Sequence, residues 1–374
     1  MKITYFINEI TGAGGIRKVT IIKANALAER GHHVEIIVSN YDSNGFFAEP
    51  ISDKVKIVQL PSNHTSSIFP HLRAVNTLLK TRKWLSRYIQ EEKPDFLINV
   101  GHSGRLLMIT LHHYDTKFIY ELHFNSRYQL IDNPQGWKYA YNLLKNWFLY
   151  RMAGHCWERI VLLTEHDLRY DWIGTKDNST VIPNPVTIHP QSSALTEKTI
   201  ISVGRLHSQK NFEQLIRAFA LVNKKHSDWQ LKIFGEGPER IALQHLIDSL
   251  NITQFVHLLG LTNEIPKELS QSSIFALASK HEGFGLVITE AMSCGLPVVA
   301  NRVPGITDIV DGQQCGFLVQ LNDHKEMAEK ICKLIELPDL RARMSQNALR
   351  RANDFTISKV LDQWEALFYE MKSI

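Results

Sequence analysis

The 374-residue sequence is poor in cysteine and carries almost no excess charge. Its four cysteines have no CxxC spacing, which argues against a disulfide framework and a structural zinc site. A formal net charge of +4 argues against a dedicated nucleic-acid binder. No run of 18 uncharged apolar residues occurs, so we expect no membrane-spanning helix. These absences favour a protein of the reducing cytosol. The cysteines are Cys156, Cys294, Cys315 and Cys332.

Leader and metal motifs are also missing. The opening MKITYFINE is charged too early for a secretory signal peptide, so we expect a cytoplasmic protein. The sequence has no Asp-x-Asp and no HExxH motif. We therefore expect no metal at the site and no cofactor.

What the sequence does have is an alternation of short apolar runs and helical periods, repeated in two rounds. This alternation is typical of α/β domains, in which helices cover a parallel sheet. We expect two doubly wound, Rossmann-like domains, 1–186 and 187–355, and a helix in 356–374 that crosses back to the first domain. Ligands of such sheets bind outside the carboxyl ends of the strands, so the expected site is a central cleft. The expected strands are 2–7, 34–39, 55–59, 95–100, 118–122 and 159–163, then 199–203, 230–234, 256–259, 273–278 and 297–300.

A glycine-rich loop, 12–15, lies between the first strand and the first helix. Glycines let a backbone approach a ligand, and the N-terminus of a helix attracts anions. A dinucleotide-binding fingerprint would have a third glycine where Arg17 stands, which disfavours an NAD-dependent dehydrogenase. The loop alone is equally consistent with a tight turn and with a phosphate contact.

Two cations follow the strand 199–203. Arg205 and Lys210 are five residues apart, between this strand and the next helix. A planar guanidinium and a compact ammonium at the carboxyl end of a strand suit a diphosphate. A solvated pair of loop residues is an equally good interpretation of the spacing.

The segment from Glu282 to Glu290 is the most specific. Glu282 stands just before a helix expected over 286–293, and Glu290 lies within that helix. Eight helical positions would place the two carboxylates about 80° apart. The N-terminus of the helix would attract a phosphate, and the carboxylates would accept hydrogen bonds from sugar hydroxyls. A carboxylate in an otherwise apolar helix is costly unless it is paired or serves a site, so the functional interpretation is favoured over a surface one.

Several segments together resemble the retaining nucleotide-sugar glycosyltransferases of family four, which have the GT-B fold. The resemblance covers nearly the whole chain and is loosest over 40–115. Its motifs are Gly14-Gly15, 181–186 (VIPNPV), 203–206 (VGRL) with Lys210-Asn211, 234–238 (FGEGP), 282–290 (EGFGLVITE), 297–300 (PVVA), Gly305 and 316–319 (GFLV).

The resemblance implies roles for individual residues. Glu282 and His123 would be catalytic, because they contact the transferred sugar. Taken alone, a histidine after a strand is more often structural. The donor-binding residues would be Gly14, Gly15, Arg205, Lys210, Phe284, Gly285, Leu286 and Glu290, with Glu290 on the ribose.

The resemblance also implies an activity. We expect transfer of a hexose or N-acetylhexosamine, with retention, from a UDP-linked sugar to a glycan acceptor. The acceptor would belong to a bacterial surface polysaccharide, a lipopolysaccharide or a lipid-linked oligosaccharide. Two alternatives stay open: another GT-B enzyme, such as a sugar-nucleotide epimerase or disaccharide synthase, and a catalytically silent partner subunit.

The first half of the chain holds the positive charge, with 22 Lys and Arg against 17 Asp and Glu over residues 1–187. Basic residues recur along one face of 70–89, opposite Leu72, Val75, Leu79, Leu85 and Ile89, and a basic, aromatic segment follows at 137–151. Such helices can lie on an anionic membrane surface. The other interpretation is an ordinary surface helix, with its basic face in solvent and its apolar face packed against the protein.

Overall fold

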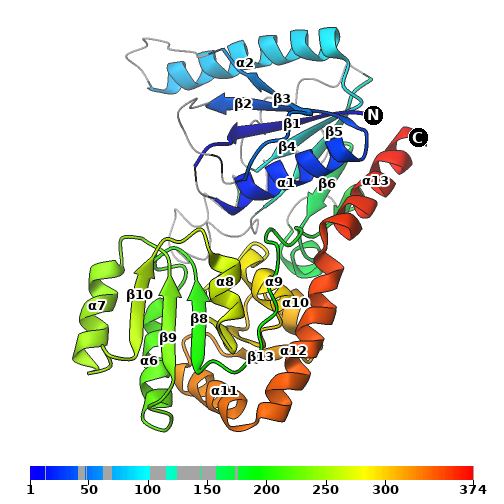
Figure 1. The fold of residues 1–374 in the computed structure, drawn as a ribbon. Helices are drawn as coiled ribbons and strands as arrows, with labels where there is room; N and C mark the ends of the chain where they lie inside the picture. Colours follow the sequence, from blue (N-terminus) through cyan, green and yellow to red (C-terminus); the bar gives the residue numbers. More distant parts are fainter. Residues whose placement is uncertain are drawn as a thin grey trace. The chain divides into compact units, whose positions relative to one another are not determined.

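The computed structural model describes residues 1–12, 14–40, 47, 49–61, 70–101, 115–123, 144, 157–172 and 176–373, with the backbone alone for 70–78 and 171. The chain forms two compact units. The first consists of Met1–Asn184 with Ile357–Ile374, and the second of Pro185–Thr356. Each unit is a parallel sheet covered by helices (Figure 1). The prediction of two Rossmann-like α/β domains is confirmed.

The first unit has a seven-stranded sheet in the order β3-β2-β1-β4-β5-β6-β7. Its order reverses between β1 and β4, and such a switch point is where doubly wound sheets bind ligands. The short strand β7 is missing from the sequence prediction. The strands are β1 (Lys2–Glu9), β2 (His33–Asn40), β3 (Val55–Gln59), β4 (Phe96–Val100), β5 (Lys117–Glu121), β6 (Arg159–Leu162) and β7 (Ser179–Val181).

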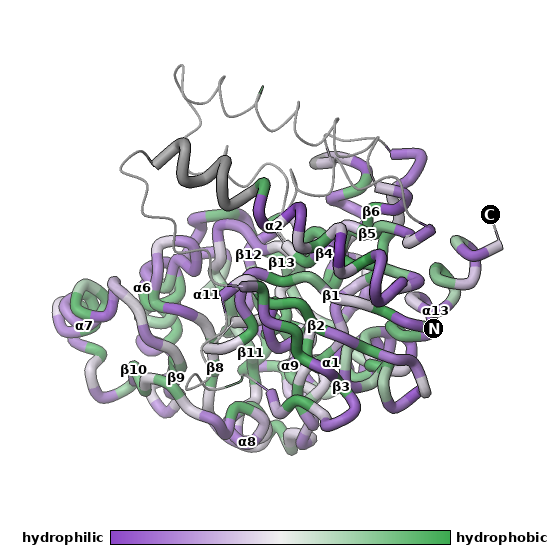
Figure 2. The backbone as a smooth tube through the Cα atoms, turned by 90° about the horizontal axis from the view of Figure 1, so that it is seen from above, coloured by the Kyte–Doolittle hydropathy of each residue, from purple (hydrophilic) through white to green (hydrophobic). Residues whose placement is uncertain are grey.

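Successive residues of β1 point to opposite faces of this sheet. Tyr5 packs with the helices α1 (Gly15–Glu29) and α13 (Ile357–Ser373), whereas Phe6 packs with α2 (Pro70–Glu92). Figure 1 shows α1 and α2 on opposite sides of the sheet, and Figure 2 shows hydrophobic residues along β1 and β2. The first unit is thus completed by a helix from the far end of the sequence.

The apolar face expected on 70–89 is partly wrong. Leu85 and Ile89 are buried as predicted, but Leu79 is 54% exposed. Leu79 lies two residues before the buried Thr81, which turns it about 200° away from the packed stripe. Lys80, Lys83 and Arg87 are exposed, as an outward basic face requires.

The second unit has a six-stranded sheet in the order β10-β9-β8-β11-β12-β13, with its switch point between β8 and β11. The strands are β8 (Thr199–Val203), β9 (Gln230–Phe234), β10 (Val256–Gly260), β11 (Ile274–Leu277), β12 (Val298–Asn301) and β13 (Gly316–Val319). The helices are α6 (Phe212–Asn223), α7 (Arg240–Ser249), α8 (Ile265–Ser270), α9 (Leu286–Ser293), α10 (Thr307–Val310), α11 (His324–Glu336) and α12 (Pro338–Ala352).

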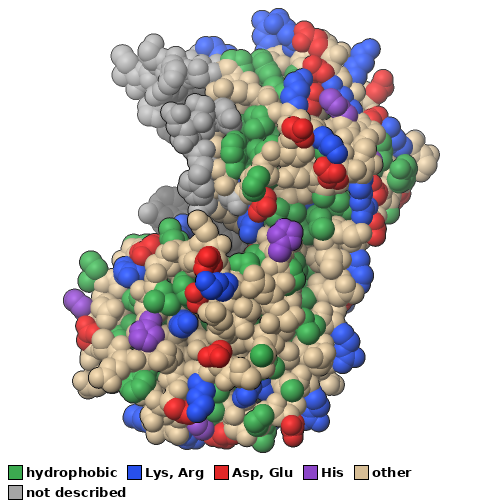
Figure 3. Space-filling view, in the orientation of Figure 1, with side chains coloured by type: hydrophobic (Ala, Val, Ile, Leu, Met, Phe, Trp, Pro, Cys, Tyr) green, Lys and Arg blue, Asp and Glu red, His purple; other side chains and the backbone are tan. Residues whose placement is uncertain are grey.

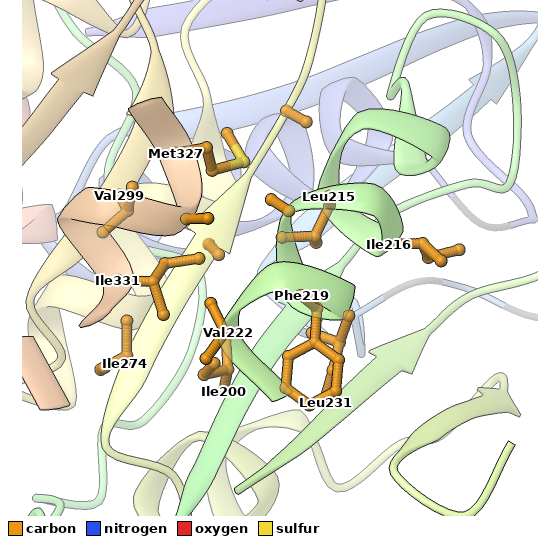
Figure 4. Packing of buried hydrophobic residues seen from close by; sticks show 14 of the residues in the cluster. Ile200, Leu215, Ile216, Phe219, Val222, Leu231, Ile274, Val299, Met327 and Ile331 are labelled. Atoms are coloured by element: carbon orange, nitrogen blue, oxygen red, sulfur yellow. The ribbon is translucent and has the colours of Figure 1, made fainter. Parts of the chain in front are cut away.

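The core of the second unit lies between this sheet and the helices α6 and α11. Phe219 and Val222 of α6 pack with Leu231 of β9, and Ile331 of α11 joins the same cluster (Figure 4). Burying each such side chain contributes about 1.5–3 kcal/mol, so the sheet is a firm platform for the loops at its carboxyl edge.

The mixed surface charge and the free cysteines agree with the expectations from the composition. Positive and negative side chains are interspersed on the face seen in Figure 3. In the described part of the chain, no helix combines the length and apolarity that a bilayer crossing needs. Cys294, Cys315 and Cys332 are free and buried, and Cys156 lies outside the described residues.

Candidate active site

Lys210 and Glu282 meet at the switch point of the second sheet. Lys210 lies in the loop after β8 and Glu282 in the loop after β11. The Nζ atom of Lys210 is 2.6 Å from Oε1 of Glu282, and the Oγ of Ser279 donates to the same oxygen at 2.6 Å. Both charged side chains are largely buried, at 16% and 10% exposure. A cation and a carboxylate are therefore held together where a ligand of this sheet would bind.

Hydrogen bonds join the two loops that carry this pair. The backbone N–H of Lys280 donates to the carbonyl of Gln209 at 2.8 Å. The side chain of Gln209 donates to the carbonyl of His281 at 3.1 Å. The buried side chain of Asn301, at the end of β12, donates to the carbonyl of Ala278 at 2.7 Å. The pair thus rests on a fixed backbone.

Two glycines shape the backbone beside Glu282. Gly285 has a φ of 86° and stands directly before α9, where no described side chain caps the helix. The N-terminus of α9 therefore keeps its ability to bind an anion. Gly305 has a φ of +83°, and a Cβ there would lie 2.6 Å from the carbonyl oxygen of Glu282. Only glycine allows this close approach.

Glu290 lies in α9 and accepts a hydrogen bond from Thr187, a residue 103 positions earlier in the chain. Both side chains are buried. The predicted angle of 80° between the two glutamates is wrong, because Glu282 precedes α9 in a non-helical loop that turns at Gly285. The helical period therefore does not relate Glu282 to Glu290.

The other residues of the second unit that were predicted to bind the donor lie in these loops or at the start of α9. Arg205 directly follows Gly204 and is exposed, and its side chain forms no hydrogen bond or ion pair with the described residues. Phe284 is buried against Phe355, with ring centroids 5.5 Å apart, and Leu286 is the first residue of α9. The structure thus pairs Lys210 with Glu282, whereas the side chain of Arg205 is exposed to solvent and is paired with no described residue.

The glycine loop of the first unit contains an ion pair that the sequence did not indicate. Gly14 stands before α1 and Gly15 begins it. Arg17, in the first turn of α1, pairs with Glu9 at the end of β1. A Cβ on Gly12 would lie 2.8 Å from the Arg17 guanidinium, so that side chain lies across the loop.

His123 belongs to a buried charged cluster in the first unit. Its Nε2 atom lies 3.1 Å from Oε1 of Glu121, the last residue of β5. The same oxygen accepts a hydrogen bond from Lys23 of α1. All three side chains are 1% exposed.

This cluster shifts the pKa values of its members. Burial raises the pKa of Glu121, but the neighbouring side chains, chiefly the charged Lys23, outweigh burial and hold that pKa well below its ordinary value. Burial lowers the pKa of Lys23, and Glu121 opposes the shift.

The described residues contain one group of three possible metal ligands, away from these loops. It comprises His226, Cys332 and Glu336, whose ligand atoms all lie within 4.8 Å of one another. His226 already forms an ion pair with Glu336 at 3.0 Å. The segment 137–151, expected to be basic and aromatic, lies outside the described residues except for Leu144.

Comparison with known proteins identifies the family. The sequence model described as Glycosyltransferase Family 4 matches residues 13–189, and the model described as Glycosyl transferases group 1 matches residues 187–351. A glycosyltransferase of Haemophilus influenzae, named as uncharacterized, is 32% identical over 371 residues, or 98% of this chain and 99% of the relative.

Two further proteins resemble the chain over nearly its whole length. The amylovoran biosynthesis glycosyltransferase AmsD of Erwinia amylovora is 24% identical over 377 residues, covering 97% of this chain and 98% of AmsD. The crystal structure of HepE from Anabaena with UDP and glucose has a TM-score of 0.75 at 18% identity, covering 99% of both chains. The chain therefore belongs to the family 4, group 1 glycosyltransferases and has their GT-B fold.

Proposed function

We propose that this glycosyltransferase moves a hexose or N-acetylhexosamine from a UDP-linked sugar to a glycan acceptor, with retention of configuration. The acceptor we propose is a precursor of a bacterial surface polysaccharide, a lipopolysaccharide or a lipid-linked oligosaccharide. AmsD, a full-length relative, is named for amylovoran biosynthesis, and HepE binds UDP and glucose in its crystal structure.

The observation that carries the proposal is the Lys210–Glu282 pair beside the uncapped N-terminus of α9. Cleaving a sugar–phosphate bond requires stabilisation of the departing diphosphate. Lys210 and Arg205 supply positive charge, and the N-terminus of α9 supplies N–H groups. Glu282 then faces the transferred sugar and Glu290 binds the ribose hydroxyls.

The reaction we propose proceeds without a metal ion. Two cations and a helix N-terminus meet the charge that a divalent ion would otherwise neutralise. Transfer therefore continues in excess EDTA. Loss of activity in the chelator, restored by added Mg²⁺ or Mn²⁺, would contradict this part of the proposal.

In the first unit, His123 is the proposed contact for the transferred sugar, and Gly14 with Gly15 the proposed loop for the phosphates. The leaving phosphate would take the acceptor proton, so that the acceptor attacks from the same face. A peripheral contact with anionic lipid through 70–89 and 137–151 would bring a lipid-linked acceptor within reach.

A donor screen tests the proposal. Purified protein is heated with UDP-, GDP- and ADP-sugars in turn, and we expect the melting temperature to rise most with a UDP-sugar. The stabilising donor is then incubated with and without glycan acceptors, and the product masses are measured. An acceptor heavier by one sugar residue supports transfer.

The other outcomes separate the alternatives. An isomerised nucleotide sugar without acceptor would indicate an epimerase, and a free disaccharide a disaccharide synthase. If none of the donors raises the melting temperature, the alternative of a catalytically silent partner subunit is favoured. As a control, Lys210→Ala should remove the UDP-sugar stabilisation, whereas Lys198→Ala, at an exposed ion pair of the same unit, should keep it.

A further inference from the structure

The first unit buries an ion pair between its helix α1 and its strand β5. Lys23 and Glu121, which are 98 positions apart, form an ion pair in which both side chains are 1% exposed. A buried ion pair is often no more stabilising than apolar side chains of the same volume. This pair therefore calls for a role beyond holding α1 to the sheet.

The pair is fixed from both sides. The Nζ atom of Lys23 lies 4.8 Å from the centroid of the Trp364 ring and 5.8 Å from that of Tyr5. Glu121 ends β5, and its Oε1 atom takes the hydrogen bond from Lys23. Its Oε2 atom has no partner among the described residues, so the contacts of Oε1 determine how the carboxylate is turned.

His123 meets that same oxygen. His123 stands two positions after Glu121, just beyond the end of β5, at the carboxyl edge of the sheet, where doubly wound sheets bind ligands. The Nε2 atom of its ring lies 3.1 Å from Oε1. Nε2 has no aligned hydrogen bond to a described residue, but a carboxylate at this distance favours the proton on Nε2 over a proton on Nδ1.

We propose that Glu121 is a positioning residue that fixes the ring orientation and tautomer of His123, and that Lys23 fixes Glu121. The inference rests on the proposed function, in which His123 contacts the transferred sugar. With the proton on Nε2, beside the carboxylate of Glu121, Nδ1 would be available to accept a hydrogen bond from a sugar hydroxyl. Glu121 itself, deep in the unit, acts on the substrate only through His123.

The low pKa of Glu121 agrees with this role. Although burial raises the pKa, the pKa is lowered overall, chiefly by the charge of Lys23, so the carboxylate stays ionised at neutral pH. An ionised Glu121 accepts hydrogen bonds and cannot donate one to the ring. The proton between the two groups therefore stays on the histidine.

The test compares wild-type protein with Lys23→Met/Glu121→Gln, a double variant that removes both charges at nearly constant volume. A single Glu121→Gln change would leave Lys23 charged and unpaired in the core. Glu35→Gln is the matched control, because Glu35 is also a buried, ion-paired carboxylate of the first sheet, but it contacts Lys56 and Tyr88 and not His123. We expect the double variant to lose about 10- to 100-fold in kcat, with donor KM changed less than about threefold.

A second measurement does not depend on activity. The ¹⁵N shifts of the His123 ring, assigned by their loss in His123→Gln, report which nitrogen carries the proton. We expect protonated Nε2 and unprotonated Nδ1 in wild-type protein and in Glu35→Gln, and a mixture of tautomers in the double variant. Glu121→Asp, which keeps the charge on a shorter side chain, is the second variant if the double variant does not fold, and it should show an intermediate loss of kcat.

The outcomes separate the two proposals. If wild-type protein transfers sugar, but the double variant keeps both the kcat of Glu35→Gln and the wild-type tautomer, the positioning inference is overturned alone. If wild-type protein transfers no sugar, the proposed function fails, and the ¹⁵N shifts still decide whether Glu121 sets the tautomer.

Discussion

The side-chain amides of Gln214 and Asn301 donate to each other, at 2.8 Å and 2.9 Å, across 87 positions of the chain. Both are buried, and Asn301 also donates to the carbonyl of Ala278 in the loop that leads to Glu282. Gln214 lies in the first turn of α6, close after Lys210. The amide pair therefore joins the segments that carry the two members of the central ion pair.

Replacing Asn301 with alanine should loosen both loops. The change leaves Nε2 of Gln214 and the Ala278 carbonyl without Asn301 as a partner, which costs about 1–3 kcal/mol of stability. We expect a fall of about tenfold in kcat/KM for the donor, measured by steady-state kinetics. Asn347→Ala removes a side-chain bond to a carbonyl, that of Gln314, at a more exposed position and is the control; equal losses of kcat/KM in the two variants would show that the effect is only structural.

Replacing Lys210 with alanine should remove positive charge from the departing diphosphate. Loss of one such electrostatic group typically costs 10²- to 10³-fold in rate, and we expect a decrease of about that size in kcat/KM. Circular dichroism should show the fold unchanged, because the side chain is not part of the apolar core. A Lys210→Ala enzyme with the wild-type rate would remove the ion pair from the proposed mechanism.

Thr187→Val tests the contact with Glu290. Valine has nearly the same shape as threonine, so the substitution removes the hydroxyl donor with little change in packing. We expect donor KM to rise about 3- to 10-fold, because Glu290 loses a group that orients it toward the ribose. Initial rates over a range of donor concentrations measure the change. An effect on kcat alone would place Glu290 elsewhere than on the nucleotide.

Glu35 provides a prediction about pH. Burial raises its pKa, but hydrogen bonds from Tyr88, His33 and Lys56 outweigh burial and hold the pKa below the ordinary value of 4.5. As the pH falls through this range the unfolded chain binds the proton first, so the stabilisation present at neutral pH is lost in acid. By calorimetry, Glu35→Gln should unfold about 5 °C lower than wild-type protein at pH 7, and the gap should shrink below about pH 4.5. If the difference in melting temperature instead widened in acid, the pKa of Glu35 would be raised by folding and not lowered.

The exposed basic residues of α2 predict binding to anionic lipid. Lys83 and Arg87 lie on the outward face, away from the buried Leu85 and Ile89. Wild-type protein should float with phosphatidylglycerol-rich vesicles at low salt, and the reversal Lys83→Glu/Arg87→Glu should remain at the bottom of the gradient. Neutral phosphatidylcholine vesicles are the control. Equal flotation of both proteins would assign the contact to another surface.

The sequence was sufficient for the regular elements with a clear hydrophobic period. The strands 199–203 and 230–234 and the helix 286–293 were predicted with the bounds that the structure has. The strand Ser179–Val181 was missed because three half-buried residues carry no measurable period. Leu79 shows that burial of an apolar residue on a helix can be predicted only from its angular position relative to the other buried residues.

The polar contacts of the site were harder to predict. Thr187 lies in a stretch that the sequence suggests is only a connection, yet it contacts Glu290 over 103 positions. Lys23 and its partner Glu121 are 98 positions apart in the chain. Only folding brings such pairs together, and no local periodicity records them. The places of Lys210 and Glu282 at the edge of the sheet could be predicted because each follows a predicted strand, but their ion pair over 72 positions was not predicted.

The helix α13 packs its Trp364 and Phe368 into the core of the first unit, although residues 185–356 of the second unit separate it from the rest of that core. During synthesis the ribosome must therefore produce the whole second unit before the first can close. The unit that is synthesised first is therefore completed last. Until α13 is made, one apolar face of its sheet is exposed. Truncation within residues 357–373 should thus cause aggregation of the first unit while the second still folds.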